Sequence, residues 1–199
     1  YLKGNMADKD VDVLLEAVLK NATTVEGRPV NSVGRAGVDY YNSLGYVPYD
    51  VGINENAART LEYAFADFTI AEMAEKMGKK ELADKFYKQS LNYKHLFDPS
   101  TNWMRGKNKD GIFQSPFNPL KWGDAFTEGN SLHYTWSVFH DVQGLIDLMG
   151  GNKNFEAKLD EVFEMPPHFD DSYYGFTIHE IREMQIVNMG NYAHGNQPV

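Results

Sequence analysis

The feature that most constrains the fold is a pair of long helical patterns separated by only a few residues. The first covers 54–77, with Asn54 as the expected N-cap, and Gly78 follows where helices commonly end. The second begins at Lys80 and continues to about Phe97. Two long helices with so short a connection pack side by side in opposite directions. This region therefore predicts an antiparallel helical hairpin.

The same organisation recurs along the chain, and no strand alternation of any length interrupts it. Further helices are expected from Asp8 or Asp10 through Leu19, and at 36–44, 132–149, 155–163 and 178–189. Helix pairs with short inner turns and long outer loops fit an all-α toroid of stacked antiparallel hairpins. The six or seven expected helices make about half of such a toroid, so the sequence predicts part of an (α/α)6 barrel. A plain helical bundle has the same periodicity and stays open as an alternative.

Composition excludes several classes of function. The 199 residues include 19 Lys and Arg against 28 Asp and Glu, a net charge of −9 without a basic cluster, so nucleic acid is not expected as a partner. No apolar run approaches the roughly 20 residues that a membrane span needs. The absence of cysteine excludes disulfides, thiolate metal sites and cysteine nucleophiles. The aromatic content of 14% is high, which suits core packing and also the exposed aromatic faces of sugar-binding clefts.

One long segment carries the first candidate for chemistry. Residues 98–129 form an expected loop of about 30 residues, rich in aromatics, that ends in the run from Trp122 to Asn130. Glu128 lies just before a helix and next to Gly129, which lets a ligand approach closely. A carboxyl group enclosed by Trp and Phe has its pKa raised by desolvation, which suits a general acid, whereas a helix N-terminus favours the anion. The alternative is that Glu128 only caps the helix.

The C-terminal segment carries the second candidate. His179-Glu180 lies at an expected helix start, and the run from His194 to Pro198 ends the chain. No two histidines are four residues apart, which argues against a histidine-ligated zinc site. Asn and Gln carbonyls together with carboxylates suit calcium better. Ordinary loop hydrogen bonding by His179 and His194 is the alternative interpretation.

Several separate motifs, in order, resemble one known family from about residue 34 to the end. They are Thr60 to Phe68, Phe97 to Ser100, Met104 to Gly111, Thr127 to Asn130, Tyr134 to Trp136, His140 to Ile146 and Tyr192 to Pro198. The chain thus resembles glycoside hydrolase family 92, the calcium-dependent exo-α-mannosidases. The resemblance implies an (α/α)6 catalytic domain that hydrolyses α-linked mannose with inversion, here of α-1,2 specificity, in glycans.

The resemblance also implies roles for particular residues. Glu128 corresponds to the family's general acid, and His179-Glu180 resembles the pair that contacts the leaving sugar. Trp122 and His194 are further candidates for substrate binding. Asn196 and Gln197 are candidate ligands of Ca²⁺, which in this family binds the hydroxyls of the terminal mannose.

The same resemblance predicts that residues 1–199 are only part of the enzyme. The family's general base lies in a motif downstream of the His194 segment, and its N-terminal β-sandwich domain precedes the toroid. We therefore expect an inactive fragment of a secreted or periplasmic enzyme, with self-association through exposed apolar helix faces. Two other functions remain open: a non-catalytic helical carbohydrate-binding module, and a different (α/α) toroid glycosidase.

Overall fold

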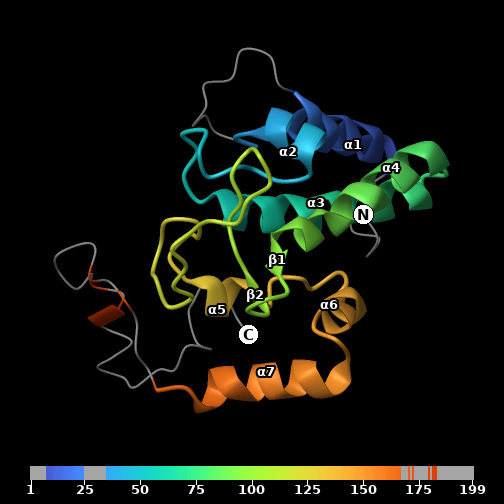
Figure 1. Cartoon of the computed structure of the whole chain (residues 1–199). Helices are drawn as coiled ribbons and strands as arrows, with labels where there is room; N and C mark the ends of the chain where they lie inside the picture. Colours follow the sequence, from blue (N-terminus) through green and yellow to red (C-terminus); the bar gives the residue numbers. More distant parts are fainter. Residues whose placement is uncertain are drawn as a thin grey trace.

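The computed structural model describes residues 8–24 and 35–166, together with positions 170, 172, 179, 181 and 182. This part of the chain is mainly helical, with α3 running through its middle (Figure 1). The helices are α1 (Asp8–Thr23), α2 (Val38–Leu44), α3 (Asn56–Lys76), α4 (Lys80–Ser90), the 3-10 helix η1 (Leu91–Leu96), α5 (Ser131–Tyr134), α6 (Val142–Leu148) and α7 (Asn152–Glu164). The two short strands β1 (Phe97–Asp98) and β2 (Trp103–Met104) pair antiparallel, with Phe97 opposite Met104.

The predicted hairpin is confirmed by α3 and α4. Gly78 adopts the left-handed φ of 70°, and the amide of Lys79 donates to the carbonyl of Ala74 at 2.9 Å. Beyond the turn, the Tyr87 hydroxyl donates to Glu72 and to Glu75, at 2.5 and 2.8 Å, so α4 returns along α3. Helix α4 ends earlier than predicted, because the chain tightens into η1 at Leu91 and then enters β1.

The start of α3 differs from the prediction. Asn54 does not cap the helix, and Glu55 at the N-cap position makes no side-chain cap hydrogen bond. The first free amides are instead satisfied from far along the chain: the N–H groups of Ala57 and Ala58 both donate to the carbonyl of Ala125, at 3.0 Å. A backbone carbonyl has no sequence signature as a cap, so sequence reasoning placed the cap locally.

The single helix predicted over 132–149 is wrong. The segment forms α5 and α6, separated by irregular backbone at 135–141. The Thr135 hydroxyl donates to the carbonyl of Ser131 at 2.7 Å and accepts from the amide of Met104 at 2.9 Å, which ties this turn to β2. The Asp141 carboxylate then caps α6 by accepting from the amide of Gly144 at 3.0 Å. Polar side chains that form hydrogen bonds with nearby backbone groups compete with the hydrogen bonds of a continuing helix. At Thr135 and Asp141 these side-chain bonds replace the predicted continuous helix.

Other boundaries follow the prediction closely. Helix α1 is confirmed, and α2 ends at Gly45 with a φ of 83°. The predicted break at Gly150-Gly151 separates α6 from α7, with φ of 87° and 106°. Of the helix predicted over 178–189, positions 179, 181 and 182 are helical and the rest lies outside the described residues.

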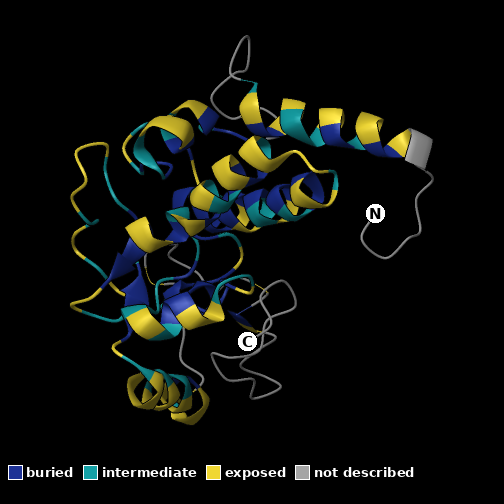
Figure 2. Cartoon of the chain, turned by 90° about the vertical axis from the view of Figure 1, so that its right-hand side faces the viewer, coloured by how far each residue is buried: buried dark blue, intermediate teal, exposed yellow. Residues whose placement is uncertain are grey.

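Most of the aromatic content serves the core. Buried residues gather along the inner faces of the helices and strands (Figure 2). Around α3, η1, β2 and α5 they form the main cluster, which includes Tyr93, Leu96, Met104, Leu132 and Tyr134. Trp136 links β2 to α7, because its ring meets Trp103 edge-on at 6.4 Å and Phe155 edge-on at 5.5 Å. Among the described residues, no helix combines the length and the apolar character that crossing a membrane requires.

We predict that the Asp141 side chain makes a large contribution to the folding stability of the α5–α6 junction. Its carboxylate caps α6 and accepts from the Tyr93 hydroxyl at 2.7 Å, so Asp141→Ala removes a cap and leaves a buried hydroxyl unpaired. The expected loss is about 1–3 kcal/mol of unfolding free energy. Asp147→Ala, on the exposed side of α6, is the matched control and should cost less than about 0.5 kcal/mol. Denaturant titration of both variants measures the difference, and equal losses would contradict the assignment.

This contribution should depend on pH. Burial alone would raise the pKa of Asp141, but the hydrogen bonds from Tyr93 and the Gly144 amide, together with Lys94, outweigh it and hold the pKa below its ordinary value. A carboxyl group with a depressed folded-state pKa stabilises the protein above its ordinary pKa and loses this contribution as pH falls through the depressed value. The stability gap between the parent and Asp141→Ala should therefore narrow on acidification.

Candidate active site

Glu128 lies on a loop that is closed by its own backbone. The amide of Gly123 donates to the carbonyl of Gly129 at 2.8 Å, which joins the two ends of residues 123–129. The buried Phe126 ring stacks on Tyr134 with centroids 5.1 Å apart, and the Tyr134 hydroxyl donates to the carbonyl of Thr127 at 2.9 Å. Packing beneath the loop and hydrogen bonds across it therefore fix the segment that presents Glu128. We call residues 123–129 the acid loop.

The acid loop holds two non-glycine residues in the left-handed region. Asp124 has a φ of 61° and Glu128 a φ of 44°, and both side chains are exposed. This conformation is unfavourable for residues with a Cβ, and it persists only where the surroundings enforce it. Backbone outliers of this kind cluster at active sites, so the exposed Glu128 carboxyl group stays a candidate for chemistry.

The alternative role of Glu128 as a helix cap is ruled out by Asn130. The Asn130 side chain accepts from the amides of Leu132 and His133, at 3.0 and 3.2 Å, and the Nδ1 atom of His133 accepts from the amide of Asn130 at 3.1 Å. This reciprocal capping box satisfies the N-terminus of α5 without Glu128. The predicted enclosure of Glu128 by aromatic rings is not seen among the described residues, because Glu128 is exposed while Trp122 and Phe126 are buried.

Trp122 is placed differently from the prediction. It is 2% exposed, and its ring meets His133 edge-on at 5.7 Å. A ring that stacks on a sugar must offer an open face, so this burial argues against direct substrate contact. Trp122 instead packs against the histidine that completes the capping box behind Glu128.

Most of the other predicted site residues lie outside the part of the chain that the structure describes. His179 is exposed and helical. Glu180, His194, Asn196 and Gln197 lie outside the described residues, so their predicted roles toward the leaving sugar and Ca²⁺ stay predictions. Within the described part of the chain, no three His, Asp or Glu side chains gather as a metal site would require.

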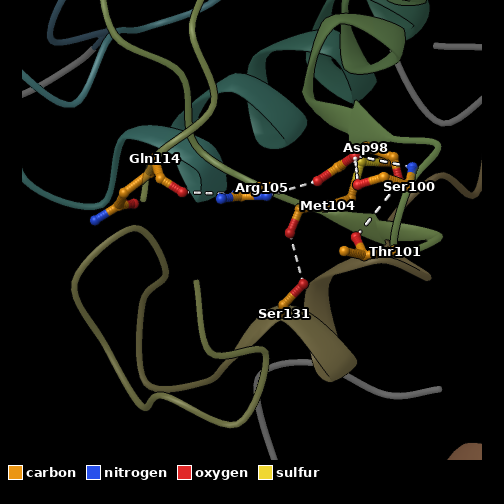
Figure 3. A network of polar contacts seen from close by, with 7 residues as sticks. All are labelled: Asp98, Ser100, Thr101, Met104, Arg105, Gln114 and Ser131. Carbon is orange, nitrogen blue, oxygen red and sulfur yellow. Dashed lines mark hydrogen bonds and ion pairs between the residues drawn. The ribbon is translucent and has the colours of Figure 1, made fainter. Parts of the chain in front are cut away.

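A polar network centred on Arg105 orders the long loop before the acid loop (Figure 3). The Arg105 guanidinium pairs with Asp98 at 2.8 Å and donates through Nε to the carbonyl of Gln114 at 2.7 Å. Its charge lies over the Phe117 ring, 4.6 Å from the centroid. Burial would raise the pKa of Asp98, but the hydrogen bonds from Ser100 and Arg105 outweigh it and hold the pKa low. Arg105 thus fixes Gln114 and Phe117 relative to β1.

Gln114 and Phe117 line a pocket that sequence reasoning missed. The pocket is a shallow surface hollow, and the space between its lining residues is about 350 Å³ when the open solvent at its mouth is included. The remaining lining comes from Gly106, Pro116, Asn118, Lys121 and the first four residues of the acid loop, Gly123, Asp124, Ala125 and Phe126. The density of Asn, Gln, Lys and Phe in one long loop was the available signal, but only the fold shows which of them converge.

The known proteins that this chain resembles in sequence and fold are glycosidases. Residues 1–199 match the model of the glycosyl hydrolase family 92 catalytic domain. An inverting mannosidase of this family from Bacteroides thetaiotaomicron is 47% identical and superposes with a TM-score of 0.78 over 96% of this chain and 26% of its own. An α-mannosidase of the family from the same bacterium is 36% identical, with a TM-score of 0.70 over 79% of this chain and 20% of its own. An uncharacterized secreted glycosidase from Arthroderma benhamiae is 29% identical over 190 residues, 80% of this chain and 24% of that protein.

These matches identify the chain as part of a glycoside hydrolase catalytic domain. The chain belongs to glycoside hydrolase family 92, and its helical hairpins form part of an (α/α)6 toroid. The alternatives of a plain bundle and of a different toroid glycosidase are thereby set aside. The chain spans about a quarter of the length of the relatives it matches.

We predict that the two contacts of the Arg105 guanidinium, with the Asp98 carboxylate and with the Gln114 carbonyl, stabilise the loop around the pocket. Arg105→Ala leaves the buried Asp98 carboxylate without its counter-charge and should cost about 3 kcal/mol of unfolding free energy. Arg105→Lys keeps the charge but cannot bridge Asp98 and Gln114 in the same way, so it should recover less than half of the loss. Arg59→Ala, which breaks a half-exposed pair with Glu55, is the control and should cost about 1 kcal/mol or less. Thermal and denaturant unfolding measure the series; full recovery by lysine would show that charge alone matters.

Proposed function

We propose that the protein containing this chain is an inverting, calcium-dependent exo-α-mannosidase that removes terminal α-1,2-linked mannose from glycans. The observation that carries the proposal is the acid loop, which holds Glu128 exposed on an enforced left-handed backbone. Support for the substrate comes from the two family members named as mannosidases, one of them inverting. The fungal relative is named as secreted, which supports a secreted or periplasmic location.

Glu128 is proposed to be the general acid. It would donate its proton to the departing glycosidic oxygen, and the rigid acid loop would keep the carboxyl group in place for the transfer. An inverting glycosidase also needs a second carboxylate about 6.5–9.5 Å away, with room for the attacking water. From the family resemblance, we propose that this base and the β-sandwich domain belong to the larger protein outside residues 1–199. We therefore propose that the chain by itself does not hydrolyse mannosides.

Calcium is proposed to be held partly by Asn196 and Gln197, whose amide oxygens are the hard ligands that Ca²⁺ prefers. When bound, the ion would orient the hydroxyls of the terminal mannose. His179 and Glu180 are proposed to contact the leaving sugar, and His194 to lie beside the site.

The role of Glu128 can be tested with two substrates in the full-length enzyme. Glu128→Gln keeps the shape but has no proton to give, so cleavage of a mannose–mannose bond should fall about 10²–10⁴-fold. An aryl mannoside with a good leaving group should be affected much less, because its departure needs little protonation. Glu156→Gln, on the exposed side of α7, is the control and should leave both rates unchanged. If the ratio of the two rates is the same in Glu128→Gln and the parent, Glu128 is not the acid.

Metal dependence is the second test. Treatment of the full-length enzyme with a calcium chelator should abolish mannose release, and added Ca²⁺ should restore it. Direct titration of the metal-free protein with Ca²⁺ should show binding that weakens in an Asn196→Ala variant. Full activity in the chelator would overturn the calcium proposal without affecting the role of Glu128.

A further inference from the structure

The pocket beside Arg105 is distinct from the position of the Glu128 carboxyl group. Part of its lining is Gly123 to Phe126, the first half of the acid loop, and the rest is Gly106, Gln114, Lys121 and residues 116–118. Neither Thr127 nor Glu128 lines it. The backbone hydrogen bond between Gly123 and Gly129 closes the acid loop. The same closed loop therefore lines the pocket with its first half and carries Glu128 in its second half. A ligand in this pocket would therefore lie next to the acid loop without occupying the position of the reacting bond.

The charges of the pocket cancel. The Asp124 carboxylate accepts from the Lys121 ammonium at 2.6 Å and from the Gln114 amide at 3.0 Å. With its cation and its anion paired to each other, the pocket offers no net charge to a phosphate or to a metal ion. What remains are amide groups and the partly exposed ring of Phe117, the combination that suits a neutral ligand with hydroxyls and apolar C–H faces.

The side of the pocket at Gly106 is closely packed. A Cβ atom built on Gly106 would lie 2.9 Å from Oδ1 of Asn56 and 3.2 Å from Oε1 of Gln114, so a larger residue would not fit there without a shift of these side chains. Asn56 is 2% exposed and does not line the pocket. The side chains that a neutral ligand can reach are therefore those of Gln114, Phe117 and Asn118.

We propose that this pocket is a subsite for a neutral sugar unit of the glycan, other than the two units joined by the bond that is cut. The inference rests on the proposed glycosidase function and extends it, because it assigns an additional binding position. Gln114 accepts from a sugar hydroxyl, and Phe117 contacts an apolar face. Arg105 is a positioning residue, since it holds both Gln114 and Phe117 through the contacts described above.

The test compares substrates of different length in the full-length enzyme. For the parent and for Gln114→Ala, kcat/KM is measured with an α-linked mannose disaccharide and with a tetrasaccharide. Loss of about one hydrogen bond to the distant sugar should lower the tetrasaccharide-to-disaccharide ratio of kcat/KM about tenfold. Phe117→Ala should lower the same ratio, and Gln143→Ala, on the exposed side of α6, should leave it unchanged. An unchanged ratio in both pocket variants overturns the subsite.

A binding measurement separates this inference from the proposed function. Calorimetric titration of the full-length Glu128→Gln protein with the tetrasaccharide should show binding that the additional change Gln114→Ala weakens about tenfold. Undiminished binding in the double variant overturns the subsite even if the enzyme is an α-mannosidase. Conversely, an enzyme that cleaves no α-mannoside yet binds the tetrasaccharide through Gln114 would overturn the proposed function and keep the subsite.

Discussion

The structure depends most on the carbonyl of Ala125, which accepts from the amides of Ala57 and Ala58 at the start of α3. Without it, the longest helix would begin with unsatisfied donors, because the Glu55 side chain makes no cap hydrogen bond. The same contact fixes the acid loop to α3, the longest of the described helices. Helix α3 and the acid loop therefore stabilise each other. The position of the acid loop, and of Glu128 on it, depends on the α3–α4 hairpin to which it is bonded.

Nearby hydrogen bonds and ring packing hold the unfavourable left-handed backbone conformations of Asp124 and Glu128 in place. The Gly123–Gly129 hydrogen bond closes the loop, and Tyr134 supports it by stacking on Phe126 and donating to Thr127. Burial raises the pKa of Tyr134 to about 12, so its hydroxyl stays protonated and continues to donate throughout the neutral range. A rigid base of this kind fixes the backbone from which the exposed Glu128 side chain projects, which a flexible surface loop would not do.

Sequence patterns were reliable where the determining interactions are local. Gly78, Gly45 and the Gly150-Gly151 pair end helices because they can adopt left-handed φ values, and this property is visible from residue type alone. The predicted long loop over 98–129 is confirmed as a largely irregular segment, and Glu128 lies near its end. By contrast, the helix predicted through Thr135 fails because the Thr135 hydroxyl also bonds to Met104, 31 residues away, and no periodicity shows that contact.

The sequence by itself determined the helical hairpins, the part-toroid architecture and, through its motifs, the family of glycosidases and the candidate acid. Only the tertiary structure decided that Asn130 is the cap, that Trp122 is buried, and that Gln114, Lys121 and Asp124 meet in one pocket. The physical reason is the range of the interactions. Helix periodicity and glycine conformations depend on neighbours within a few residues, whereas a pocket or a backbone cap depends on which distant segments the core brings together.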